Sequence, residues 1–518
     1  MVTKQQAYPP ETLPPAPARQ YGNTVSGPAP ARWTRLLDGA IYLFFAFFAV
    51  LLPHSIKGAQ HAWQLAFLAW LVKLAVERKR PFQQPLAAPL LAYITLSAIS
   101  TMLSPDPFLS WDRMKIVCLV LVGIVFAQNL HRLTQVRTLT VLLILSGVAA
   151  AGFTAWQYSY GVGAQVTHID KGSPLYHAGL RQDDIITSVN NRPISTPEKL
   201  EEAVRSGPDG LLQVGFYRVL RFEPFRKREV IISPDELLRS GLGTPALQLR
   251  RGKPFRAQGT LGHYVIFAEM LMQISCLTWA LLLSVPASKR RWQVLLAVAL
   301  VALTAAILAT ETRSVVAGLA VGCAAALLVL TEKRTRLWAS AALLLLVISA
   351  GLWMSHTRGT HWIDARDPGT NFRLLMWEDG LRLLHQHPWF GIGMETARNH
   401  WGEWNIRAFR LYHVQSHFHS DTIQIAVERG LPALGAWLWF VVAYFLFLLR
   451  LLRKARAHSR FATGVVAGIL AAFIAWQTTA LVHYNLGEES LVMILFFYFG
   501  VAVAIDRMLT AKEAVDVA

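Results

Sequence analysis

Long apolar stretches alternate with short polar connections along most of the chain. Runs such as LLDGAIYLFFAFFAVLL, VLLAVALVALTAAILAT and SAALLLLVISAGLWM contain almost no charged residue. A helix of about 20 apolar residues can span a bilayer, because it satisfies its own backbone polar groups where lipid cannot. The pattern therefore predicts a polytopic α-helical membrane protein with about twelve transmembrane helices. The predicted spans cover residues 36–53, 61–77, 84–103, 114–129, 136–156, 262–285, 291–310, 314–331, 336–354, 432–450, 462–483 and 487–507.

Short basic clusters fall in alternate connections and predict the orientation of the chain. ERKR, SKRR, TEKRTR and LRKARAHSR lie on one side, whereas PHSIKGAQH, SPDPFLSWD and VHYNLGEES on the other side hold few lysines or arginines. Cytoplasmic loops carry the excess of Lys and Arg, so both termini are expected in the cytoplasm. The predicted organisation is a cytoplasmic tail (1–35), helices one to five (36–157), an outer domain (158–240), helices six to nine (241–354), an outer loop (355–431), helices ten to twelve (432–508) and a second cytoplasmic tail (509–518).

Composition supports a protein surrounded by membrane lipid and excludes a nucleic-acid partner. The 518 residues are 53% hydrophobic and 16% charged, whereas soluble domains are about 25% charged. The net charge of +18 comes from clusters between apolar runs, which is the pattern of membrane topology. The Pro-rich N-terminal tail is expected to be disordered, without a removable signal peptide.

The first outer segment contains alternating strands, AQVTHI and DIITSV, with a helix predicted at 197–205. The stretch SPLYHAGL…DDIITSVNNRPI is similar to a PDZ domain of the bacterial envelope type, although Asp183 replaces the usual glycine. The resemblance implies a small α+β domain. In it, the N–H groups of Gly161, Val162 and Gly163 would bind the C-terminal carboxylate of a periplasmic protein. A spacer domain without a ligand is the alternative.

The second outer segment concentrates groups that bind phosphate. From Ser355 to Leu431 it holds eight arginines, no lysine and eight of the sixteen histidines. The planar guanidinium group of arginine matches phosphate oxygens, whereas lysine is a point charge. Solvated pairs with the eight acids of the same segment are the alternative. His413 and His417 are four residues apart and could bind zinc, but no third ligand follows, so no metal is expected.

Two helices are predicted in this segment, and one of them begins beside a histidine. The first begins near Asn371. The second begins at Ser420 or Asp421 and ends at Gly430, in a Gly-Leu-Pro sequence. The dipole of the second helix disfavours a positive charge on His419. A neutral imidazole is therefore expected near pH 7, as a general base requires.

Three motifs extend this picture: HQHPWFGIGMET, HSDTIQIAVERGLPALG and ATETRSVVAGLAVG, with FRAQGTLGHYVIFAEML as a fourth, weaker one. Together they resemble the O-antigen ligase / O-antigen polymerase family of bacterial inner-membrane glycosyltransferases. The resemblance covers most of the chain outside the PDZ-like insert, although Ser420 stands where the family often has asparagine. It implies a GT-C-like fold that transfers a glycan from undecaprenyl diphosphate to an acceptor hydroxyl, on the periplasmic side.

The resemblance also implies roles for individual residues. By position, His419 would be the catalytic histidine, and Arg313 and Arg373 would bind the donor diphosphate. Arg256 and Arg410 are further candidates for the diphosphate site. Fixed arginines can neutralise the diphosphate charge without a metal, so neither a metal nor another cofactor is expected.

Several acceptors and two non-enzymatic functions remain open at this level. Lipid A-core is the expected acceptor. A second lipid-linked unit would make the protein an O-antigen or exopolysaccharide polymerase, and a protein hydroxyl would make it a protein O-oligosaccharyltransferase. The PDZ-like insert favours a protein partner. A transporter or a PDZ-bearing envelope sensor is disfavoured, because transporters place ionisable residues at mid-membrane, and these spans are almost free of charge apart from Glu269.

Overall fold

The structure is a computed structural model. It describes residues 32–77, 84–161, 163–190, 192–205, 211–217, 227–239, 246–252, 256–332, scattered positions between 337 and 352, 368–412 and 416–517.

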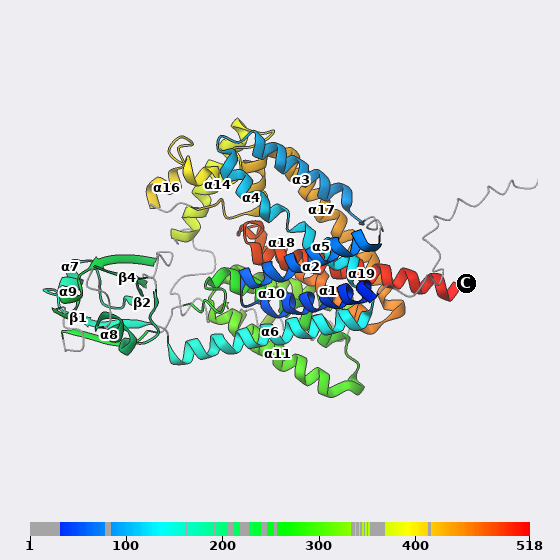
Figure 1. Cartoon of the computed structure of the whole chain (residues 1–518), viewed down its shortest axis with the longest axis horizontal. Coiled ribbons are helices and arrows are strands. Elements are labelled where there is room, and N and C mark those ends of the chain that lie inside the picture. Colours follow the sequence, from blue (N-terminus) through cyan, green and yellow to red (C-terminus); the bar gives the residue numbers. More distant parts are fainter. Residues whose placement is uncertain are drawn as a thin grey trace, which may run out of the picture.

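Apolar helices dominate the described part of the chain (Figure 1). Eight of the described helices are long and apolar enough to cross a membrane, which agrees with a multi-pass membrane protein. The number twelve and the orientation in the membrane stay predictions. The eight are α1 (Arg32–Leu51), α6 (Leu133–Tyr160), α10 (Tyr264–Ser284), α11 (Arg290–Ala309), α12 (Arg313–Leu330), α17 (Asp421–His458), α18 (Arg460–Ala480) and α19 (Glu489–Val517).

Three predicted spans differ in detail from the described helices. The span predicted at 114–129 is divided between α4 (Pro107–Val117) and α5 (Val120–Asn129). The span predicted at 84–103 is the shorter helix α3 (Ala87–Met102), and α2 (Ile56–Glu77) is close to its predicted bounds. The span predicted at 336–354 lies largely outside the described residues.

Small residues let α12 and α18 pack closely. A Cβ atom added at Gly318 would lie 2.6 Å from the Cγ2 atom of Thr479, and one at Gly322 would lie 2.7 Å from the carbonyl oxygen of Ala471. Helices in a bilayer associate through such close approaches, because lipid provides no hydrophobic drive between them. The contact fixes the N-terminus of α12 beside the C-terminus of α18.

Three shorter helices, α14 (Pro368–Gln386), α15 (Thr396–Asn399) and α16 (Arg407–Tyr412), precede α17. Figure 1 shows α14 and α16 together, on the side of the bundle away from the C-terminus. The helix expected to end at the Gly-Leu-Pro sequence does break there. Gly430 has non-helical torsion angles (φ 83°, ψ 171°), and α17 then continues to His458.

A separate sheet domain follows α6 and lies at the end of that helix in Figure 1. Its six-stranded sheet has the order β5-β4-β2-β1-β6, with β3 paired to β2, and all its pairs are antiparallel. The elements are β1 (Ala164–Ile169), α7 (Pro174–His177), β2 (Ile185–Val189), β3 (Arg192–Pro193), α8 (Pro197–Arg205), β4 (Leu212–Tyr217), β5 (Lys227–Ile232), α9 (Pro234–Arg239) and β6 (Leu247–Arg251).

The domain boundary predicted at residue 240 is too early. Strand β6 pairs with β1, where Ala164 lies opposite Arg251, so the sheet closes only at Arg251. The chain therefore enters and leaves the domain at adjacent points. This is the geometry of an inserted domain, because such an insertion leaves the flanking helices where they are.

Candidate functional site

The backbone at His419 has a left-handed conformation. Its φ angle is 51°, which few residues other than glycine adopt. Ser420 caps α17, since its side chain accepts a hydrogen bond from the N–H of Ile423. The next residue, Asp421, accepts a hydrogen bond from the N–H of Leu486 at 3.0 Å. Backbone strain of this kind persists only where surrounding contacts hold it, and it is common at functional sites.

Side chains from two directions hold the His419 ring. The Phe372 ring from α14 lies 5.6 Å away, and the His417 ring lies 4.2 Å away. Nε2 of His419 is 3.2 Å from the hydroxyl of Ser416. The indole N–H of Trp377 donates to the carbonyl of Phe418 at 2.9 Å. The face of α14 that carries Trp377 and, one turn earlier, Arg373 therefore lies against the His419 segment.

The His419 imidazole is neutral near pH 7, as expected. Burial lowers its pKa well below the ordinary value, and the neighbouring basic groups His417 and Arg373 lower it further. Burial, rather than the helix dipole, is the first cause. The pKa of His417 is lowered to about 3, again by burial first and then by neighbouring cations.

Six basic side chains, His419 among them, lie close together at this site and are called the basic cluster below. The positive groups that lower the pKa of His417 come from four segments of the chain: the turn before α10, α14, α15 and the turn after α18. Burial, then His483 and Arg256, lower the pKa of His263. The members of the basic cluster are His263, Arg373, Arg398, His417, His419 and His483.

The four predicted arginines lie at different places relative to this cluster. Arg313 is the first residue of α12, and the adjacent Ser314 hydroxyl lies 2.9 Å from Nε2 of His483. Arg373 is a member of the cluster. The Arg256 guanidinium carbon lies 4.6 Å from the ring centre of Tyr264, the first residue of α10. Arg410 is exposed on α16.

Sequence reasoning missed three members of the cluster. His263 and His483 lie at the ends of predicted spans, within the quoted stretches FRAQGTLGHYVIFAEML and VHYNLGEES. Arg398 follows the glycine turn at 391–393. A histidine at the end of each of two predicted spans was the available signal, because ionisable residues at membrane spans are often functional.

The glycine turn at 391–393 packs against the break in α17. The N–H of Ile392 donates to the carbonyl of Val427, and the N–H of Gly393 donates to the carbonyl of Glu428, both at 2.9 Å. A Cβ atom added at Gly430 would lie 2.1 Å from the carbonyl oxygen of Trp389. Glycine is therefore required for the two backbones to approach this closely.

A buried amide network joins this turn to the His419 segment. The N–H of Glu395 donates to the carboxylate of Glu428 at 2.7 Å, and the side-chain amide of Gln424 donates to the same oxygen at 2.7 Å. The carbonyl oxygen of the Gln424 side chain accepts from the N–H of Phe418 at 2.6 Å. The position of His419 thus depends on the first two turns of α17.

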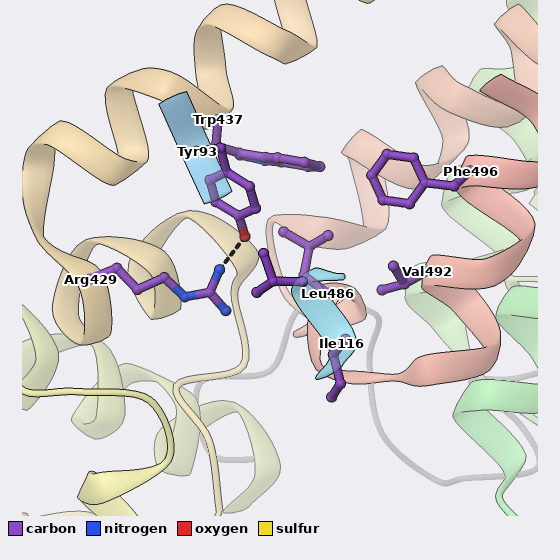
Figure 2. Close-up of a pocket in the computed structure, with 8 residues that line it drawn as sticks. Tyr93, Ile116, Arg429, Trp437, Leu486, Val492 and Phe496 are labelled. Atoms are coloured by element: carbon purple, nitrogen blue, oxygen red, sulfur yellow. Dashed lines mark hydrogen bonds between the residues drawn. The ribbon is translucent and has the colours of Figure 1, made fainter. Parts of the chain in front are cut away.

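A buried arginine, Arg429, lies close to the cluster but contributes to the packing of α17. Figure 2 shows Arg429 pointing toward Tyr93, to whose hydroxyl it donates a hydrogen bond. The neighbouring cavity, lined by Trp437, Leu486 and other apolar residues, measures about 10 Å³. A space of that size holds about one water molecule, which is too small for a lipid headgroup.

The glycines predicted to bind a peptide carboxylate are used to close the PDZ-like domain. The N–H of Gly161 donates to the carbonyl of Gln157 at 2.9 Å, and that of Gly163 donates to the carbonyl of Ser195 at 3.1 Å. Val162 lies outside the described residues. Carboxylate binding by this loop stays a prediction, and it would require these two N–H groups to exchange partners.

Comparisons with known proteins agree with these observations. Residues 165–218 match a PDZ domain, which is the sheet domain after α6. Residues 298–438 match the family described as O-antigen ligase. This range contains Arg313, Arg373, Arg410 and His419, whereas Arg256 precedes it. No curated protein gives a significant match to the chain. The chain is thus a multi-pass membrane protein that contains a segment of the O-antigen ligase family at 298–438 and, ahead of it, a PDZ domain at 165–218.

Proposed function

We propose that the protein moves a glycan from undecaprenyl diphosphate to the hydroxyl of lipid A-core, on the periplasmic face of the bacterial inner membrane. The basic cluster around His419 is the observation that carries this proposal. It gathers two arginines, from α14 and α15, and two histidines at the ends of apolar helices, next to a neutral imidazole. Glycosyl transfer from a lipid diphosphate needs those two features, because it releases a charged leaving group and removes one proton.

Two arginines are proposed to hold the donor diphosphate. The lipid carrier keeps the diphosphate at the membrane surface, so donors are needed both from a span end and from the loop above it. Arg313 at the start of α12 supplies the first, and Arg373 in α14 supplies the second. Fixed guanidinium groups stabilise charge that develops on the leaving group. Arg256 and Arg410 are the further candidates for this site.

His419 is proposed to take the proton of the attacking hydroxyl. Its pKa is low because of burial and of the basic groups His417 and Arg373. The negative charge of a bound diphosphate would favour the protonated imidazole and raise the pKa of His419 toward the operating pH. The base would therefore become effective when the donor is bound, which matches the requirement for a catalytic pKa near ambient pH.

A protein hydroxyl is the second candidate acceptor, because a PDZ domain at residues 165–218 indicates a protein partner. A polymerase that uses a second lipid-linked unit shares the same donor chemistry. Glycan profiling of a deletion strain separates the three. Bare lipid A-core with accumulated polymer indicates a ligase, single repeat units indicate a polymerase, and lost protein glycosylation indicates an oligosaccharyltransferase.

The role of His419 is tested by expressing the His419→Ala protein in the deletion strain and measuring glycan transfer. Transfer should fall by roughly 10²–10⁴-fold, the usual share of a general base. His385→Ala is the matched control, because His385 is an exposed histidine of α14 outside the basic cluster. Near-normal glycan transfer by a well-expressed His419→Ala protein would remove His419 from the mechanism.

A further inference from the structure

Three side chains, from α10, α12 and the turn after α18, form a hydrogen-bonded series at the edge of the basic cluster. The Ser314 hydroxyl in α12 lies 2.9 Å from Nε2 of His483, and Nδ1 of His483 lies 3.0 Å from a carboxylate oxygen of Glu269 in α10. The other carboxylate oxygen of Glu269 accepts from the hydroxyl of Thr479 at 2.9 Å. Both ring nitrogens and both carboxylate oxygens are therefore engaged.

The series is buried at one end and open at the other. Glu269 is 1% exposed and His483 is 6% exposed, whereas Ser314 is half-buried. A buried carboxylate of this kind is costly unless it is fully paired, and a neutral side chain of similar shape would pack a helix contact at lower cost. The ordered direction, from a buried acid through an imidazole to an accessible hydroxyl, suits proton transfer.

The position of Ser314 indicates which group receives the proton. It follows Arg313, the residue proposed to bind the diphosphate, so its hydroxyl lies on the leaving-group side of the site. His419 lies on a different segment, at the N-terminus of α17. The two histidines also differ in surroundings. His483 has a carboxylate at 3.0 Å, whereas burial and neighbouring basic groups lower the pKa of His419.

We propose that Glu269, His483 and Ser314 form a proton relay that protonates the leaving diphosphate. This inference rests on the proposed glycosyl transfer. As the bond between the anomeric carbon and the phosphate oxygen breaks, its electron pair stays on that oxygen. The oxygen takes the proton of the Ser314 hydroxyl, and Ser314 takes the proton on Nε2 of His483. Glu269 balances the charge of the protonated imidazole before transfer. Meanwhile the acceptor oxygen bonds to the anomeric carbon, and its proton goes to His419.

Charged and titratable groups lie on several segments around His483. Glu269 in α10 faces Nδ1, and Arg313 begins the helix that carries Ser314. The imidazoles of His263, His417 and His419 are close enough for His483 to lower the pKa of each. Those rings favour their neutral form, and Glu269 is the carboxylate in direct contact with the His483 ring.

The experiment measures undecaprenyl diphosphate released from the lipid-linked glycan of membranes prepared from a strain that lacks this chain. Purified full-length protein is added, and turnover and donor KM are measured separately. Ser314→Ala, which removes a single oxygen atom, His483→Gln and Glu269→Gln should each lower turnover by roughly 10²–10⁴-fold with donor KM unchanged. Ser314→Thr keeps the hydroxyl and should retain most of the rate. Thr278→Val is the control, because Thr278 is a buried hydroxyl deeper in α10.

Two further results distinguish a relay from a structural contact. Residues that act as one unit lose their effect together, so the Ser314→Ala/His483→Gln double variant should be no slower than the slower single variant. Wild-type turnover should also fall at high pH, as the relay loses its proton, and the His483→Gln variant should lack that fall. Multiplicative losses in the double variant, or a fall at high pH that the His483→Gln variant keeps, would overturn the relay.

The outcome also separates this inference from the function it rests on. If wild-type protein releases undecaprenyl diphosphate and the three relay variants match it, the relay is wrong and the transfer stands. If wild-type protein releases none, while the same membranes support release by another ligase, the proposed transfer itself is wrong.

Discussion

The N–H of Ile392 donates to the carbonyl of Val427 at 2.9 Å, across a gap of 35 residues in the sequence. This bond ties the glycine turn after α14 to the helix that begins directly after His419. The carbonyl of the next residue, Glu428, accepts from Gly393, and its side chain accepts from Glu395. The turn therefore fixes the first segment of α17, and that segment fixes His419.

Gly430 is expected to be essential for this arrangement. Alanine there would place a methyl group 2.1 Å from the carbonyl oxygen of Trp389 and would strain a φ angle of 83°. We expect Gly430→Ala to destabilise the protein by at least about 1–3 kcal/mol, measured as a lower melting temperature in detergent. Gly435→Ala, in the same helix with no atom within 4 Å, should be close to neutral. Equal melting temperatures for the two variants would contradict the steric argument.

Lysine at Arg313 or Arg373 should impair transfer, and alanine should impair it more. Lysine keeps the charge but loses the bidentate geometry of the guanidinium group. Loss of one charge-assisted hydrogen bond costs about 1.5–3 kcal/mol, or roughly 10- to 150-fold in rate. The effect should appear as weaker use of the lipid-linked donor, with acceptor binding intact.

Arg382→Lys is the control on α14, since Arg382 contacts the backbone carbonyls of Trp404 and Asn405. Wild-type donor affinity and rate in both alanine variants would redirect the search to Arg256 and Arg410.

His417 should make the folded protein sensitive to acid. Its pKa is about 3 in the folded chain, because of burial and nearby cations, and near 6.5 when unfolded. Between these values the unfolded chain binds more protons, so stability falls as pH decreases below about 6.5. The loss by pH 5 is up to about 2 kcal/mol. His417→Asn should lose less melting temperature between pH 7 and pH 5 than wild type. A parallel decline in both proteins would assign the acid sensitivity to other groups.

Transfer is expected to persist in excess EDTA. The motivation is a segment rich in arginine and free of lysine from Ser355 to Leu431, with Arg313 and Arg373 proposed to offset the diphosphate charge. Release of undecaprenyl diphosphate by purified protein should be unchanged after chelation and dialysis. Activity that disappears and returns only with Mg²⁺, Mn²⁺ or Zn²⁺ would show that a metal carries that role.

Removal of the PDZ domain should leave some transfer. Its first and last strands pair at Ala164 and Arg251, so a short flexible linker can replace 164–251 without moving α6 or α10. We expect the shortened protein to insert, to elute as a single species and to keep measurable transfer to lipid A-core. A shortened protein that elutes normally yet transfers nothing would make the domain part of the active site.

Local patterns were sufficient to predict several features of the site. The spacing of apolar runs predicts the long helices. A cap at Ser420 or Asp421 was predicted, and Ser420 is the cap; the break at Gly430 follows from the Gly-Leu-Pro sequence. These features depend on neighbours within a few residues. The neutral state of His419 was also predicted, but from the helix dipole, whereas burial is the larger cause. Burial depends on the whole fold, so no local pattern could have revealed it.

The sequence by itself determined the class of protein, the inserted domain and the residues that match the ligase family, because apolar length, alternation and motif spacing are properties of the chain. Only the tertiary structure decided which distant groups meet. Glu269, Ser314 and His483 belong to three separate helix ends. They come together because Gly318 and Gly322 let α12 approach α18. Likewise, the division of the predicted span 114–129 and the closing of the sheet by β6 result from contacts between segments far apart in sequence, which periodicity along the chain does not encode.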